Sequence, residues 1–193
     1  EMGFIKDHTD IMAMAQGVHS HIARTLAGRH PDVLKRMGIE APLVPEKFPV
    51  LKLVEAQEII EKEFGGKAVG EPDLEPEHER QLCEWARKEH GSDYLFVTHY
   101  PVGKRPFYTA EDESDPGFTK SFDLLFRGLE ITTGGQRVHD YETLIAKARA
   151  KGLDPEKFSY YLQAFKYGMP PHGGTGNGLE RLTALMLGIK NVR

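Results

Sequence analysis

The sequence has little cysteine, no long hydrophobic run and no excess of positive charge. A single cysteine, Cys83, among 193 residues excludes a disulfide framework and a cysteine-based zinc site. No apolar stretch approaches the roughly 18 residues that span a bilayer, and no signal peptide opens the chain. Because 25 Lys and Arg residues stand against 29 Asp and Glu residues, any contact with RNA must be local. The expected compartment is the cytoplasm.

The chain does contain enough apolar residues for a core. It is 39% hydrophobic and 28% charged, which excludes wholesale disorder and predicts one domain, or one domain with a small insertion. Prolines at 42, 45 and 49 predict an extended connector over 38–50. Apolar periodicity predicts helices at about 10–28, 54–64, 75–90, 140–151, 154–166 and after 178, and strands at 94–98, 105–109, 121–127, 129–133 and 173–178. The predicted fold is α+β, with a mostly antiparallel sheet flanked by helices.

The glycine-rich segment HGGTGNGLERL, residues 172–182, is the most distinctive stretch. Gly174, Gly176 and Gly178 alternate, so along an extended strand all three face the same side. A strand face without side chains lets a flat or bulky ligand lie against the backbone. The helix that follows offers free N–H groups to a phosphate, and Arg181 offers a planar cation. The spacing fits neither a P-loop nor a Rossmann motif, and a tightly packed glycine loop stays an alternative.

A second polar cluster lies in FDLLFRGLEITTGGQR, residues 122–137. On a regular strand Glu130 and Thr133 would face opposite sides, and a bend at glycines 134–135 is expected to bring Thr133 back beside Glu130. A carboxylate and a hydroxyl, completed by phosphate oxygens and water, suit Mg²⁺. Arg137 offers a bidentate fork to a carboxylate. The alternative interpretation is a solvated strand edge with a surface ion pair.

The nine histidines and the lone cysteine predict no further site. His19 and His21 lie two apart on a helix and face different sides, so they are expected to be solvated. The pair His78-Glu79 begins a zinc-protease motif but lacks its second histidine, so it is likewise expected to be solvated. Cys83 on an amphipathic helix is expected to be a small core residue.

Together these stretches resemble the class II aminoacyl-tRNA synthetases, and within them the aspartate enzymes of archaeal and eukaryotic type. GGTGNGLERL resembles the third class II motif, a strand–helix unit that carries an arginine. FDLLFRGLEITTGGQR resembles the strand that binds Mg²⁺ and the amino acid in the aspartate enzymes. RPFYT (105–109) and FKYGMPPHGG (165–174) are similar to family segments in the same order, and residues 2–5 resemble the closing strand of the second motif. The likeness spans nearly the whole chain.

The resemblance implies roles for particular residues. Arg181 would hold the adenine and outer phosphates of ATP and, with Glu130, would be catalytic. Glu130 and Thr133 would coordinate Mg²⁺, and Glu130 would also contact ATP. For aspartate, Arg137 would pair with the side-chain carboxylate, Thr133 would touch the amino acid, and Arg105 would lie near the same pocket. The other implied ATP contacts are Gly178, Leu179 and Glu180.

The resemblance also implies an activity and partners. The α-carboxylate of aspartate attacks the α-phosphate of ATP to give aspartyl-adenylate, and the aspartyl group passes to the 3′ end of tRNA-Asp, with tRNA-Asn as a second candidate. Such a step depends on positioning and charge neutralisation rather than on a general base. ATP is thus the expected co-substrate and Mg²⁺ the expected metal. The full-length enzyme is expected to be a homodimer without membrane attachment.

Several family segments are expected to be missing from this chain. These are the first class II motif, most of the second motif and the N-terminal anticodon-binding barrel. Residues 1–193 are therefore expected to form a partial catalytic domain that is inactive alone. The helices at about 54–90 are expected to be a family-specific elaboration, without an assigned function.

Other functions stay open at this point. An asparagine–tRNA ligase shares the pocket framework, although Arg137 favours a carboxylate over an amide. A synthetase-like paralogue could amidate aspartate to asparagine, and it would lack the anticodon-binding barrel. A non-catalytic regulatory paralogue would be expected to lose Arg181, Glu130 or Arg137, and all three are present.

Overall fold

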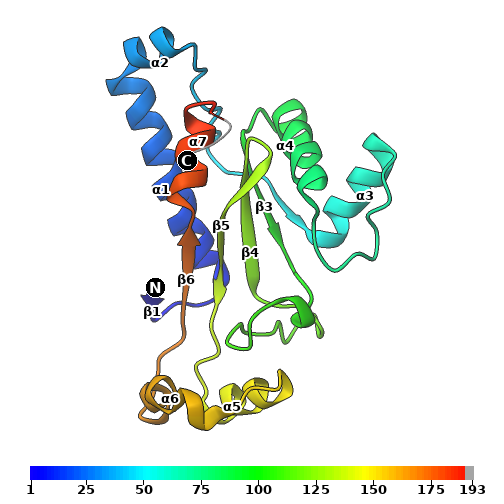
Figure 1. The fold of residues 1–193 in the computed structure, drawn as a ribbon, viewed down its shortest axis with the longest axis vertical. Helices are drawn as coiled ribbons and strands as arrows, with labels where there is room; N and C mark the ends of the chain where they lie inside the picture. Colours follow the sequence, from blue (N-terminus) through cyan, green and yellow to red (C-terminus); the bar gives the residue numbers. More distant parts are fainter. Residues whose placement is uncertain (190–193) are drawn as a thin grey trace.

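The computed structural model describes residues 1–189. A single six-stranded sheet has the order β1-β6-β5-β4-β3-β2 (Figure 1). The strands are β1 (Met2–Gly3), β2 (Val50–Lys52), β3 (Tyr94–Thr98), β4 (Ser121–Phe126), β5 (Leu129–Gln136) and β6 (His172–Asn177). The helices are α1 (His8–Arg29), α2 (Pro31–Met37), α3 (Leu53–Phe64), α4 (Pro76–His90), α5 (Tyr141–Ala150), α6 (Ser159–Lys166) and α7 (Leu179–Met186).

The sheet is mostly antiparallel, which confirms the predicted α+β fold. Within residues 1–189, only β2 and β3 pair in parallel. The short strand β2 and the helix α2 were not predicted, because both lie around the proline-containing connector, where no periodic pattern is long enough to reveal them. The predicted strand at 105–109 is wrong. The amide of Thr109 donates to the carbonyl of Pro106 at 3.0 Å and closes a turn there, and Pro106 itself has no N–H to donate to a sheet.

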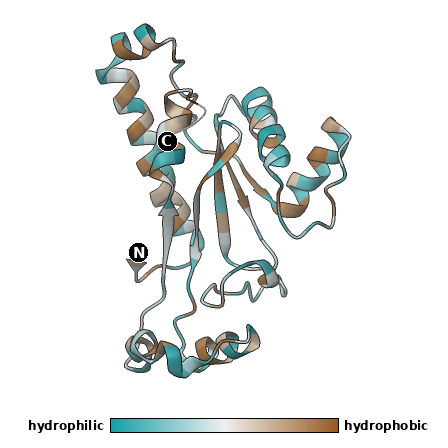
Figure 2. Cartoon of the chain, viewed as in Figure 1, coloured by the Kyte–Doolittle hydropathy of each residue, from teal (hydrophilic) through white to brown (hydrophobic). Residues whose placement is uncertain are grey.

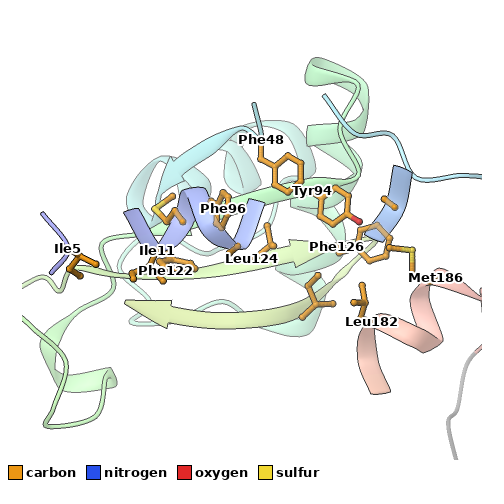
Figure 3. Close-up of a cluster of buried hydrophobic side chains, with 14 residues drawn as sticks. Ile5, Ile11, Phe48, Tyr94, Phe96, Phe122, Leu124, Phe126, Leu182 and Met186 are labelled. Carbon is orange, nitrogen blue, oxygen red and sulfur yellow. The ribbon is translucent and has the colours of Figure 1, made fainter. Parts of the chain in front are cut away.

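Different helices pack against the two faces of the sheet. Alternate residues of β3 and β4, such as Phe96 and Leu124, point to one side and pack against α1 and α7 (Figure 3). We call this side the α1 face. The residues between them, Leu95, Val97 and Leu125, point to the other side and pack against α3 and α4; we call it the α4 face. This alternation explains why β3 and β4 are buried along their whole length.

Helices cover the α4 face only in part. The helices α3 and α4 lie beside the β2 and β3 half of the sheet (Figure 1), whereas Thr133 of β5 and Gly176 of β6 are exposed. A sheet covered by helices on both sides is buried on both faces. Since Thr133 and Gly176 are exposed instead, a ligand can reach β5 and β6 on the α4 face.

The helices α5 and α6 form a separate cluster at one end of the sheet (Figure 1). Their apolar residues pack with Val138, which follows β5, around Leu144, Leu162 and Phe165. In Figure 2 these helices alternate hydrophobic and hydrophilic bands, as expected for helices with one buried side. No helix among residues 1–189 combines the length and the apolar character that crossing a membrane requires.

Candidate functional site

The ladder between β4 and β5 contains one extra residue in β5. Glu130 pairs with Leu125, but Thr132 pairs with Leu124, so that Ile131 has no partner of its own. Such a β-bulge carries the residues beyond it to the face opposite to the one that a regular strand would give them. The bulge therefore decides which side chains of β5 reach the uncovered half of the α4 face.

Glu130 and Thr133 consequently lie on the same face. Thr133 pairs with Asp123 of β4, and cross-strand partners share a face. The predicted bend at glycines 134–135 is wrong, because β5 runs through both residues to Gln136. Glycine is needed at 134 for close packing instead, since a Cβ there would lie 2.6 Å from Cζ of Phe122.

Asp123 is the centre of a network that the sequence analysis missed. Its side chain is nearly buried, with 5% of the residue exposed. Nη2 of Arg105 lies 2.7 Å from Oδ2 of Asp123, and the hydroxyl of Thr133 donates to Oδ1. The guanidinium of Arg105 also lies 3.8 Å from the centroid of the Tyr100 ring. A charged residue inside the apolar run FDLLF was the available signal, because such residues are buried only when paired.

Arg181 and Glu130 meet at one end of this network. Nη1 of Arg181 donates to the backbone carbonyl of Glu130 at 3.0 Å and lies 3.8 Å from its carboxylate. Burial raises the pKa of the Glu130 carboxyl group, and the neighbouring Asp123 adds to the rise, while Arg181 and the Thr133 side chain oppose it. The Arg181 side chain remains 54% exposed, so it can contact a ligand as well.

The glycines of β6 face the site as the alternation predicts. Gly176 pairs with Thr133 and Gly174 with Gly135, which places both on the α4 face. A Cβ at Gly176 would meet only the carbonyl oxygen of Thr133, at 4.0 Å, so this stretch of backbone is open. The face of Gly174 is instead occupied by the carboxylate of Glu1.

Arg137 lies at the other end of the same face. Its Nη2 is 3.2 Å from Oε1 of Glu1 and 3.4 Å from the carbonyl oxygen of Gly174. The guanidinium also stacks over the ring of Tyr108, with 5.1 Å to the centroid. Arg137 therefore pairs with the Glu1 carboxylate in this structure, and its contact with the side chain of aspartate stays a prediction.

The predicted site residues are thus only partly brought together. Arg105 and Thr133 contact Asp123, and Arg181 joins this group through Glu130. Arg137 and Arg181 line different cavities, of about 660 and 910 Å³. The three remaining predicted ATP contacts lie at the start of α7: Gly178 packs beside Arg181, while Leu179 and Glu180 point into solvent.

The acidic residues near Arg181 fit a Mg²⁺ site in which the protein supplies only one or two ligands. Among residues 1–189 no three or more His, Cys, Asp and Glu side chains are arranged to hold a metal by themselves. Mg²⁺, however, commonly takes one or two carboxylates and completes its shell with phosphate oxygens and water. The carboxylate of Asp123 lies near that of Glu130 and adds to the rise of the Glu130 pKa. A cation bound with phosphate would relieve this repulsion between the two carboxylates, so Glu130 and Thr133 could hold the metal.

This fold, including the glycine strand that leads into an arginine-bearing helix, is shared with solved aminoacyl-tRNA synthetases. Over 100% of this chain, the structure superimposes on 40% of the Entamoeba histolytica aspartyl-tRNA synthetase, with a TM-score of 0.90 and 33% sequence identity. An asparaginyl-tRNA synthetase from Pyrococcus horikoshii gives a TM-score of 0.88 at 28% identity, over 99% of this chain and 45% of that chain.

The chain belongs to the class II tRNA synthetases of the D, K and N group, whose family model matches residues 1–193. It is 49% identical to the aspartate–tRNA(Asp/Asn) ligase of Thermus thermophilus over 193 residues, which are 100% of this chain and 45% of that protein. It is 37% identical to the aspartate–tRNA(Asp) ligase of Pyrococcus abyssi, over 100% of this chain and 44% of that protein. The chain thus spans less than half the length of these relatives.

Proposed function

We propose that the protein carrying this chain is an aspartate–tRNA ligase. It would activate L-aspartate with ATP and transfer the aspartyl group to the 3′ end of tRNA-Asp. tRNA-Asn would be a second acceptor, because the relative from Thermus thermophilus is named an aspartate–tRNA(Asp/Asn) ligase. The partners would be these tRNAs and a second copy of the full-length protein. The observation that carries the proposal is the cluster of Asp123, Thr133, Arg105, Glu130 and Arg181 beside the open glycine backbone of β6.

Each part of the cluster suits one part of the reaction. The open backbone at Gly176 gives room for a nucleotide, and Arg181 supplies positive charge for its phosphates. Mg²⁺, held by Glu130 and Thr133, would neutralise charge on the phosphates. Asp123 keeps the Arg105 guanidinium and the Thr133 hydroxyl in place before a ligand arrives, which lowers the cost of organising the site.

The end of the site at Arg137 favours aspartate over asparagine. A guanidinium binds a carboxylate through two parallel, charge-assisted hydrogen bonds, whereas an amide can accept with only one oxygen. An asparagine–tRNA ligase remains the second candidate, because a solved structure of that specificity has nearly the same fold.

Amino-acid-dependent exchange of pyrophosphate into ATP, measured on the full-length gene product, tests the proposal. We expect exchange with aspartate and Mg²⁺ and much weaker exchange with asparagine. Charging of purified tRNA-Asp and tRNA-Asn then separates the two tRNA specificities. Exchange that responds only to asparagine, or to neither amino acid, would refute the proposal.

A further inference from the structure

The helical unit α3–α4 supplies no residue to the proposed reaction, yet α4 reaches the site. The backbone N–H of Glu130 donates to Oε2 of Glu79, in the first turn of α4, at 2.9 Å. Glu130 stands next to the bulge residue Ile131, so this hydrogen bond fixes the backbone at the place where β5 leaves its regular register. Glu79 is partly buried there.

The neighbours of Glu79 on α4 hold the same β4–β5 hairpin. A Cβ at Gly128 would lie 3.0 Å from Cγ of Arg80, so the helix and the turn are in close contact. One turn further along the helix, the buried thiol of Cys83 faces the backbone amides of Gly128 and Leu129. Three successive contacts on one side of α4 therefore meet the segment that leads into Glu130.

The helix itself is firmly seated. Leu82 and Ala86 are fully buried and pack, together with α3, against Leu95 and Leu125 of the sheet. A side chain on such a well-packed helix has little freedom to move. A residue that orients a functional residue needs this fixed position. The hydrogen bond from Glu130 thus connects the site to a well-packed helix rather than to a loop.

We propose that Glu79 is a positioning residue: by accepting the Glu130 amide it sets the direction in which the Glu130 carboxylate meets the metal ion bound with ATP. This proposal rests on the proposed function. It also assigns a role to the α3–α4 unit, which would serve as the support of the metal-binding end of β5. The proposal requires that the Glu79 side chain be long enough to accept the hydrogen bond from the Glu130 amide. It does not require that Glu79 carry a negative charge.

Two variants separate reach from charge. Glu79→Asp keeps the charge but shortens the side chain by one methylene, so that the carboxylate no longer reaches the Glu130 amide. Glu79→Gln keeps the length and an acceptor oxygen but removes the charge. Glu58→Gln and Glu58→Asp on α3 are matched controls, because Glu58 is exposed on the same helical unit.

The first measurement is Mn²⁺ binding to the full-length gene product by electron paramagnetic resonance, in the presence of a non-hydrolysable ATP analogue. The second is hydrogen–deuterium exchange of a peptide that contains Glu130. We expect Glu79→Asp to weaken Mn²⁺ binding by about 10- to 100-fold, the usual effect of losing an outer partner of a metal ligand, and to speed exchange in that peptide. Glu79→Gln and both controls should resemble the wild type.

Wild-type Mn²⁺ binding by Glu79→Asp would overturn the proposal. An equal loss in Glu79→Gln would also overturn it, because the charge of Glu79 would then be what matters. Neither measurement needs turnover, so failure here is distinct from failure of the proposed function. That function stands or falls on pyrophosphate exchange by the unaltered protein.

Discussion

Replacing Gly176 with alanine tests whether the bare backbone of β6 is the seat of the nucleotide. The backbone φ of Gly176 is not positive, and an added Cβ would have open space, with its nearest neighbour 4.0 Å away. Alanine therefore fits the folded chain without strain. Such a change usually stabilises a protein by about 0.4–1 kcal/mol, because the unfolded chain loses conformational freedom.

The same methyl group would project from the α4 face, toward any ligand that lies against the strand. Intrusion of one methyl group into a well-packed contact costs roughly 1–3 kcal/mol. That cost corresponds to a loss of about 5- to 150-fold in affinity for ATP. Stability and ligand binding should therefore change in opposite directions in Gly176→Ala.

Thermal denaturation and ATP binding, both measured on the full-length gene product, provide the assay. Gly134→Ala is the contrasting variant. Its Cβ would lie 2.6 Å from Phe122 and 2.8 Å from the carbonyl oxygen of Gly174, so it should lower the melting temperature. Wild-type ATP affinity in a folded Gly176→Ala would refute the reasoning, because the nucleotide would then not lie on this backbone.

Three further outcomes are expected. Arg181→Ala should lower ATP–pyrophosphate exchange by at least about 100-fold, the usual cost of removing one charge-stabilising donor; wild-type exchange would contradict its role with ATP. Arg137→Lys should raise the KM for aspartate far more than the KM for ATP, because lysine cannot form the bidentate contact, and an unchanged KM for aspartate would remove Arg137 from the pocket. Burial lowers the pKa of His19 below its ordinary value of 6.5, so the unfolded chain takes up the proton first and the free energy of unfolding should fall as the pH drops below about 6.5. Chemical denaturation between pH 7 and pH 5 should show a shallower fall in His19→Gln, and an unchanged slope would show that His19 does not contribute.

Patterns along the chain predicted those parts of the fold that depend on local spacing. The helical periodicity after Asp10 and the alternation of Gly174 and Gly176 each describe one element, and both elements formed where expected. Cys83 is buried as predicted, and burial raises the pKa of its thiol to about 12. The placement of Glu130 beside Thr133 was also anticipated, although for the wrong local reason.

Features that depend on distant partners could not be predicted in the same way. His19 and His78 were expected to be solvated, but both are buried. Nε2 of His19 lies 3.0 Å from the Thr132 hydroxyl and 3.3 Å from the Asn177 side chain. Asp123 and Glu79 acquire their roles only when β4, β5 and α4 come together. No spacing within one segment encodes those contacts, because they join residues far apart along the chain.

The extra residue at Ile131 makes the length of this strand as important as its composition. Deleting that single position would restore a uniform ladder, turn the Thr133 hydroxyl toward the apolar layer beneath α1, and send the neighbouring core side chains outward. Substitutions in this stretch should therefore be tolerated more readily than insertions or deletions. Any engineered graft of this hairpin onto another scaffold has to keep its count of residues as well as their identities.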